Sequence, residues 1–112
     1  EISSKGVALQ TRLEAAEYVA ALSEPVLDLK ERIQSLLSTH TLPRLRKGKA
    51  YDLRPLILAL EELDNEKSRP QRLWMRLMAK EGATGRPEEV LAALGLTPET
   101  ANIQRIRLIF RE

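Results

Sequence analysis

The sequence contains no cysteine and only one histidine among its 112 residues. Without cysteine the chain forms no disulfide, no thiolate zinc site and no iron–sulfur ligation, and it offers no cysteine nucleophile. The single histidine, His40, excludes a histidine-rich metal site and a two-histidine relay. No apolar run approaches the roughly 20 residues that span a membrane, and no stretch resembles a signal peptide.

Aromatic residues are also scarce, at 4%, and no single charge dominates, since the formal net charge is +2. With 43% hydrophobic and 30% charged residues, the composition is that of an ordinary folded domain rather than a disordered chain. The length suits one domain. Because the sequence starts at Glu1 without methionine, we expect residues 1–14 to be a lead-in from a missing upstream part, followed by a single domain over 15–112.

Hydrophobic periodicity predicts alternating strands and helices. In residues 53–63, helical spacing and strand alternation fit equally well, and a helical turn followed by a strand is the favoured interpretation. Gly95 followed by Leu96 predicts a left-handed helix end. The predicted elements are strand 15–22, helix 28–38, strands 42–46 and 50–53 around a turn at 47–49, helical turn 53–56, strand 57–63, loop 61–69, strand 71–79, loop 82–85, helix from residue 86, and strand 103–110.

This order of strand, helix, strands, helix and strand is typical of an α+β fold. We therefore expect a ferredoxin-like sandwich, in which two helices cover one face of an antiparallel sheet. The residues near 42–56 are expected to form a short extra strand or turn added to that sandwich.

Three sequence features look like sites and have simpler explanations. His40 follows the first predicted helix, where a cap or a solvated side chain explains it better than catalysis. Four carboxylates between residues 61 and 66 lack the glycine that a calcium loop needs for its sharp turn, so a solvated loop is preferred. Residues 82–87 lead into a helix N-terminus, where an anion site is the minority interpretation because the spacing matches no phosphate-binding motif.

Arginine and tryptophan gather on two predicted strands. Arg72, Trp74 and Arg76 alternate with apolar residues, and Arg105 and Arg107 are expected to line one face of the last strand. An open sheet face with arginine and an aromatic ring is how some sheet proteins bind RNA, although the usual RNA-recognition consensus is absent. The alternative is that these side chains solvate the sheet and that Trp74 packs against it.

Three stretches together resemble one known family. The Asp-Leu-Arg-Pro and Arg-Pro-Glu-Glu-Val blocks are the most specific part of the similarity, which runs from about Ile2 to Phe110. In order and spacing the stretches resemble the radical SAM-associated (radical SAM-linked) protein family of unknown function, and they cover the C-terminal half of its domain. The stretches are Ala16–Tyr18, Arg46–Ile57, and Gly85–Leu91 continuing to Ile103–Arg105.

The resemblance implies a bacterial cytoplasmic protein with a radical-SAM protein, fused or encoded beside it, as partner. The iron–sulfur cluster and S-adenosylmethionine belong in that partner, and the missing upstream half is a second expected neighbour. The present chain is then a non-catalytic accessory domain. Within the two specific blocks, Asp52 is expected to cap a turn, and Arg54 and Arg86 are either structural or converge on an anionic group.

Two functions follow from these observations. The first is recognition of RNA or another anionic substrate for the partner enzyme. The second is docking to a protein without nucleic-acid contact. A stand-alone enzyme is disfavoured because the sequence shows no acid–base or nucleophile constellation.

Overall fold

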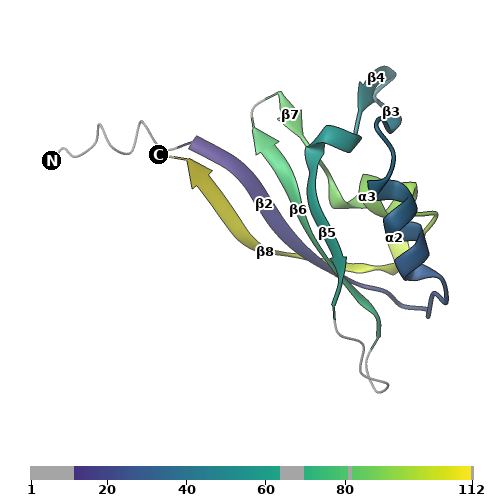
Figure 1. Cartoon of the computed structure of the whole chain (residues 1–112). Coiled ribbons are helices and arrows are strands. Elements are labelled where there is room, and N and C mark those ends of the chain that lie inside the picture. The colour runs from purple at the N-terminus through teal and green to yellow at the C-terminus, as the bar shows by residue number, and fades with distance from the viewer. Residues whose placement is uncertain (1–11, 64–69, 81, 112) are drawn as a thin grey trace, which may run out of the picture.

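The computed structural model of the chain describes residues 12–63, 70–80 and 82–111 (Figure 1). Over these residues the chain folds into a four-strand sheet with a short fifth strand, a separate two-stranded hairpin and two helices. The elements are β2 (Arg12–Ala21), α2 (Leu29–Leu37), β3 (Pro43–Arg46), β4 (Lys49–Asp52), the 3-10 helix η1 (Arg54–Leu56), β5 (Ile57–Glu62), β6 (Arg72–Lys80), β7 (Ala83–Thr84), α3 (Pro87–Ala93), the 3-10 helix η2 (Pro98–Thr100) and β8 (Asn102–Arg111).

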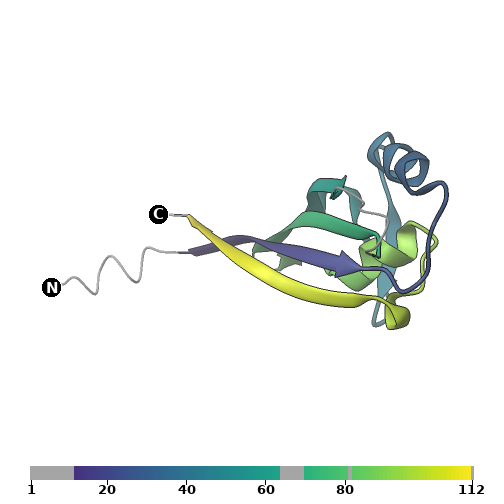
Figure 2. The same ribbon diagram turned by 90° about the horizontal axis from the view of Figure 1, so that it is seen from below.

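The main sheet has the strand order β5-β6-β2-β8, and every neighbouring pair is antiparallel. β7 pairs with the end of β6, while β3 and β4 pair only with each other. Both helices lie toward one end of the sheet, and β2 and β8 run away from them as a long ribbon (Figures 1 and 2). The predicted α+β class, with an antiparallel sheet and two helices, is confirmed.

One face of the sheet and both helices share a single hydrophobic core. On β6, Leu73, Met75 and Leu77 are fully buried, so the predicted alternation along this strand is confirmed. Both helices add to this core the apolar side chains that recur at helical spacing. Those helical core residues are Leu29, Ile33 and Leu36 of α2 and Val90 and Leu91 of α3, with Leu94 at the end of α3.

Residues 53–63, which fitted both helical spacing and strand alternation, form a helical turn followed by a strand. Arg54–Leu56 forms η1, whose second residue is Pro55, and the chain then extends as β5 from Ile57. Leu56, Ile57 and Leu60 are buried on the core side, whereas Leu58 lies at a register shift and is 47% exposed. The predicted helical turn followed by a strand is therefore confirmed.

Residues with positive φ occur at two points where the chain changes direction. Lys47 and Gly48 both have positive φ, at 53° and 80°, and close the β3–β4 hairpin at the predicted turn. Gly95, with φ 78°, ends α3, and Leu96 N–H donates to the carbonyl of Leu91 at 2.9 Å. This is the predicted left-handed helix end.

The strand bounds differ from the prediction mainly at the start of the chain. β2 begins at Arg12 rather than at residue 15, because residues 12–14 extend the ribbon with β8. Residues 1–11, and most of the predicted loop 61–69, lie outside the described residues.

Candidate nucleic-acid interface

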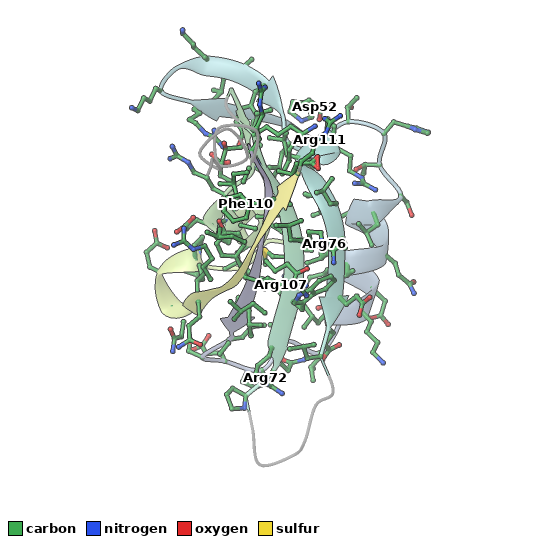
Figure 3. All side chains as sticks on the ribbon, turned by 90° about the vertical axis from the view of Figure 1, so that its left-hand side faces the viewer. Asp52, Arg72, Arg76, Arg107, Phe110 and Arg111 are labelled. Carbon is green, nitrogen blue, oxygen red and sulfur yellow. The ribbon has the colours of Figure 1, made fainter. Side chains whose placement is uncertain are left out.

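The face of the sheet opposite the helices carries the predicted arginine and tryptophan side chains of β6. Residues directly opposite each other on neighbouring antiparallel strands share a face. The register pairs Glu17 with both Arg76 and Arg107, and Val19 with Trp74, so these side chains lie on one surface. Together with Arg72, this set is called the open face below. Arg72, Arg76 and Arg107 are labelled in Figure 3.

Trp74 is half-buried on the open face, and Arg76 covers part of it. The Arg76 guanidinium carbon lies 5.5 Å from the centroid of the Trp74 ring, which is cation–π distance. The ring is thus neither fully packed in the core nor free as a flat platform. Any flat ring that stacked there would have to use the part of the indole that Arg76 leaves uncovered, or displace the guanidinium.

An ion pair occupies the centre of the open face. Arg76 Nε donates to Glu17 Oε2 at 2.9 Å, and Arg76 Nη2 forms an ion pair with the same oxygen at 2.7 Å. The Glu17 side chain is only 6% exposed, while that of Arg76 is 41% exposed. The Arg76 hydrogen bond lowers the pKa of Glu17 and outweighs burial, which acts in the opposite direction; Trp74 and Arg107 contribute further lowering. Glu17 therefore holds Arg76 in place and neutralises it.

Replacing Glu17 by glutamine is expected to lower the free energy of unfolding at pH 7 by about 1–2 kcal/mol, since a charge-assisted bond is lost at a partly exposed pair. Because the pKa of Glu17 is lowered from 4.5, the pair stabilises the fold above that pH and loses its effect as pH falls through the folded-state value. The difference in free energy of unfolding between wild type and Glu17→Gln should therefore become smaller toward pH 3, as measured by urea titrations.

The exposed loop residue Glu24 provides the matched control for that experiment, since Glu24→Gln removes a carboxylate that faces solvent. This control should alter the free energy of unfolding at pH 7 by less than about 0.5 kcal/mol. A Glu17→Gln gap that stays constant from pH 7 to pH 3 would contradict the assigned role of the pair.

Arg105 does not share the face of Arg107, so the prediction that both line one face of the last strand is wrong. The register pairs Arg107 with Glu17 but Arg105 with Tyr18, and it leaves Ile106 without a partner. A β-bulge at Ile106 thus inserts one residue and reverses the alternation. Arg105 points to the helix side of the sheet, where it is exposed.

Arg54 makes hydrogen bonds that match the structural alternative of the two roles expected for it. Its guanidinium donates to the backbone carbonyls of Leu37 at 3.1 Å, Thr39 at 3.2 Å and Ile57 at 3.2 Å. It therefore supplies a positive charge to the end of α2, whose own last turn contains no basic residue. These contacts favour the structural alternative over convergence of Arg54 with Arg86 on an anion.

The remaining residues of that motif also have structural contacts. Asp52 Oδ1 accepts from the backbone N–H of Leu42 at 2.7 Å and of Arg54 at 3.1 Å, so its predicted role at the turn is confirmed. Arg86 precedes α3 as an exposed residue whose side chain makes no capping hydrogen bond.

A cluster of three polar residues joins the β3–β4 hairpin to α3, and no sequence pattern predicted it. Arg46 donates to Glu89 from two nitrogens, with Nε at 3.1 Å from Oε2, and also to the Thr84 carbonyl at 3.1 Å. Its guanidinium carbon lies 4.6 Å from the centroid of the Tyr51 ring. Arg46 and Tyr51 come from one family-like block and Glu89 from the other, so the contact brings the two blocks together.

Burial and charge act in opposite directions within this cluster. Burial alone would raise the pKa of Glu89, but the hydrogen bonds with Arg46 and Tyr51 lower it below its ordinary value. Burial raises the pKa of Tyr51, and the neighbouring Glu89 raises it further. Glu89 is thus held ionised and Tyr51 protonated, which suits a fixed structural link.

Other functional-site types find little support in the described part of the chain. No group of three or more His, Asp or Glu side chains comes together there to hold a metal ion. Among the same residues, no helix has the length and hydrophobicity needed to cross a bilayer. His40 is exposed just after α2. Of the four acidic residues in 61–66, only Glu61 and Glu62 are described, and they lie at the end of β5.

The chain was also compared with known proteins. No family model, no curated protein and no solved structure matches it.

Proposed function

We propose that this chain is a non-catalytic binding module of a radical SAM-associated protein, and that its open face recognises RNA for a partner radical-SAM enzyme in the bacterial cytoplasm. One observation carries the RNA part: Trp74 lies between Arg72 and Arg76 on a sheet face without helices, with Arg107 on the same face. Single-stranded nucleic acids are bound by such combinations of cationic and aromatic side chains.

The arrangement of strands supports a ferredoxin-like fold for this module. Leaving aside the short β7 and the β3–β4 hairpin, the chain order is strand, helix, two strands, helix and strand, and the sheet order is β5-β6-β2-β8. A split βαβ arrangement of this kind leaves one sheet face without helices. The β3–β4 hairpin with η1 is then the added segment near residues 42–56.

The proposed affiliation with the radical SAM-associated family rests on the sequence resemblance of the two blocks. In the fold the two blocks are in contact through the ion pair of Arg46 with Glu89. The proposed division of labour places the iron–sulfur cluster and S-adenosylmethionine in the partner enzyme, because this chain has no cysteine for a cluster.

Phosphate contacts on the open face would come from Arg72 and Arg107 more than from Arg76. Arg76 is already neutralised by Glu17, whereas no ion pair between described residues involves Arg72 or Arg107. Arg12 of β2 and Arg111 of β8 form a cross-strand pair at the far end of the ribbon and extend the positive charge along it. The path for a single strand thus crosses Trp74 and follows β8.

Binding of a fluorescent single-stranded RNA should weaken steeply with salt. With three to four neutralised phosphates, the slope of log K against log salt is expected to be roughly −2 to −3. Arg72→Ala and Arg107→Ala should each flatten that slope by about 0.7. Trp74→Ala should remove about 1–3 kcal/mol of stacking without altering the slope. Fluorescence titrations at several salt concentrations measure all three quantities.

Arg105→Ala is the matched control, because Arg105 lies on the same strand as Arg107 but on the opposite face. It should leave both affinity and slope almost unchanged. Circular dichroism of each variant confirms that the fold is retained. No binding at low salt, or equal effects of Arg105→Ala and Arg107→Ala, would reject recognition of RNA by the open face.

A further inference from the structure

β8 is an edge strand whose outer side has no partner in the described part of the chain. It is ten residues long and pairs only with β2 there. Natural edge strands are usually protected by shortness, charged side chains, proline, bulges or inward-pointing charges. β8 has no proline and a single bulge of its own, at Ile106, since the other register shift inserts Glu14 in β2. Its charged side chains are all arginines, which repel a basic strand but attract an acidic one.

Large apolar side chains are exposed along this edge. Ile106 is 51% exposed, Leu108 37% and Phe110 52%, and Leu13 on the adjoining end of β2 is 36% exposed. Four of the seven exposed large hydrophobic residues in the described chain thus lie on the β2–β8 ribbon. An exposed apolar surface that continues along a free edge is typical of an interaction site.

The two faces of this edge differ in chemistry. Leu108 pairs with Ala16 and Phe110 with Leu13, which places them on the helix side of the sheet. Arg107 and Arg111 belong to the opposite face, together with Ile109 between them. Beyond Ile106, the edge is therefore apolar on one face and basic on the other (Figure 3).

We propose that the outer edge of β8 binds an extended acidic strand of a partner protein by β-augmentation. Backbone hydrogen bonds would continue the sheet beyond β8, as in other domains that add a peptide strand. Acidic side chains at alternate positions would meet Arg107 and Arg111. The apolar residues between them would cover Leu108 and Phe110. This surface is the outer edge of β8, and it shares Arg107 with the open face. Peptide binding at this edge does not require RNA binding.

The positive charge of β8 favours an acidic partner strand over β8 of a second copy of this chain. All three charged residues of β8 are arginines. Antiparallel pairing of β8 with itself, centred on residue 107, 108 or 109, places one arginine opposite another, which is destabilising. A depression of about 780 Å³ lies at the same end of the ribbon, between β2 and the end of β6. Among the described residues that line it are Arg12, Lys80 and Arg111, with Glu14 as the one carboxylate.

A blocked ten-residue peptide that alternates valine with glutamate tests the proposal. It should bind the full chain, and its binding should slow amide hydrogen exchange in β8. A peptide of the same composition with five valines followed by five glutamates should bind at least about tenfold more weakly, because it cannot match both faces. A valine–lysine peptide should bind more weakly still.

Two protein variants sharpen the test. Phe110→Ser should weaken binding of the alternating peptide about tenfold or more, and Arg107→Glu should shift the preference toward the lysine peptide. Arg72→Glu, on the inner strand β6, should leave that preference unchanged. Three outcomes would overturn the proposal. They are equal binding of the alternating peptide and the peptide with five valines followed by five glutamates, exchange protection elsewhere than β8, and a stable dimer in light scattering. If Phe110→Ser still binds RNA, a failure of the peptide proposal can be distinguished from a failure of RNA binding by the open face.

Discussion

Replacing Leu91 by aspartate is expected to unfold the domain at room temperature. Leu91 is fully buried and lies in the same core cluster as Val90, Leu77 and Leu53. An unpaired carboxylate at this position costs several kcal/mol, which approaches the whole stability of about 5–15 kcal/mol of a small domain. Circular dichroism should show loss of the folded signal without denaturant, or a urea midpoint close to zero.

The neighbouring residue provides a matched control for this substitution. Ala92 lies in the same helix, next to Leu91, but its side chain is exposed. Ala92→Asp should cost only about 0.5–1 kcal/mol, which is the difference in helix propensity. A Leu91→Asp variant that unfolds at the wild-type urea concentration would show that α3 does not pack as described.

Replacing Arg54 by alanine is expected to lower the free energy of unfolding by about 2–4 kcal/mol, since three carbonyls lose a charged donor. The guanidinium connects the end of α2 to the start of β5 through Leu37, Thr39 and Ile57. Arg54→Lys should recover less than half of the loss, because a compact ammonium does not reproduce the planar fork. Urea denaturation of the three proteins measures these differences.

Arg86→Ala is the control for Arg54→Ala, because Arg86 is exposed and its side chain makes no capping bond. It should alter stability by less than about 0.5 kcal/mol. The affinity for single-stranded RNA should be unchanged in the folded fraction of both variants. An Arg54→Ala protein of normal stability but reduced RNA affinity would return Arg54 to the anion-binding role.

The elements of the fold could be predicted because their signals are local. The apolar residues of β6 alternate, Gly48 and Gly95 mark turns that need positive φ, and Pro55 opens a helical turn. The open face was partly predictable for the same reason. Arg72, Trp74 and Arg76 alternate with core residues, so their shared direction follows from the strand itself.

The one wrong placement, and the contacts that the sequence did not reveal, depend on register or on distant partners. Because of the bulge at Ile106, Arg105 and Arg107 lie on opposite faces of the sheet. No turn residue or change of periodicity in the sequence predicts this bulge. Arg32 donates to the carbonyl of Leu94 at the end of α3, and Arg54 does the same for α2 from another element. Such contacts join residues far apart in sequence, so composition and spacing show only that the charges are present.

The position of β2 in the sheet also bears on when the domain can fold during protein synthesis. β2 lies between β6 and β8, and its pairs with β8 join residues about 80 to 100 positions apart, from Ala21 with Asn102 to Arg12 with Arg111. Most of the chain must therefore leave the ribosome before β2 gains its second neighbour. Until then the edge of β2 that pairs with β8 has no partner. At this stage of synthesis, chaperones or strands of other chains can compete with β8 for that edge.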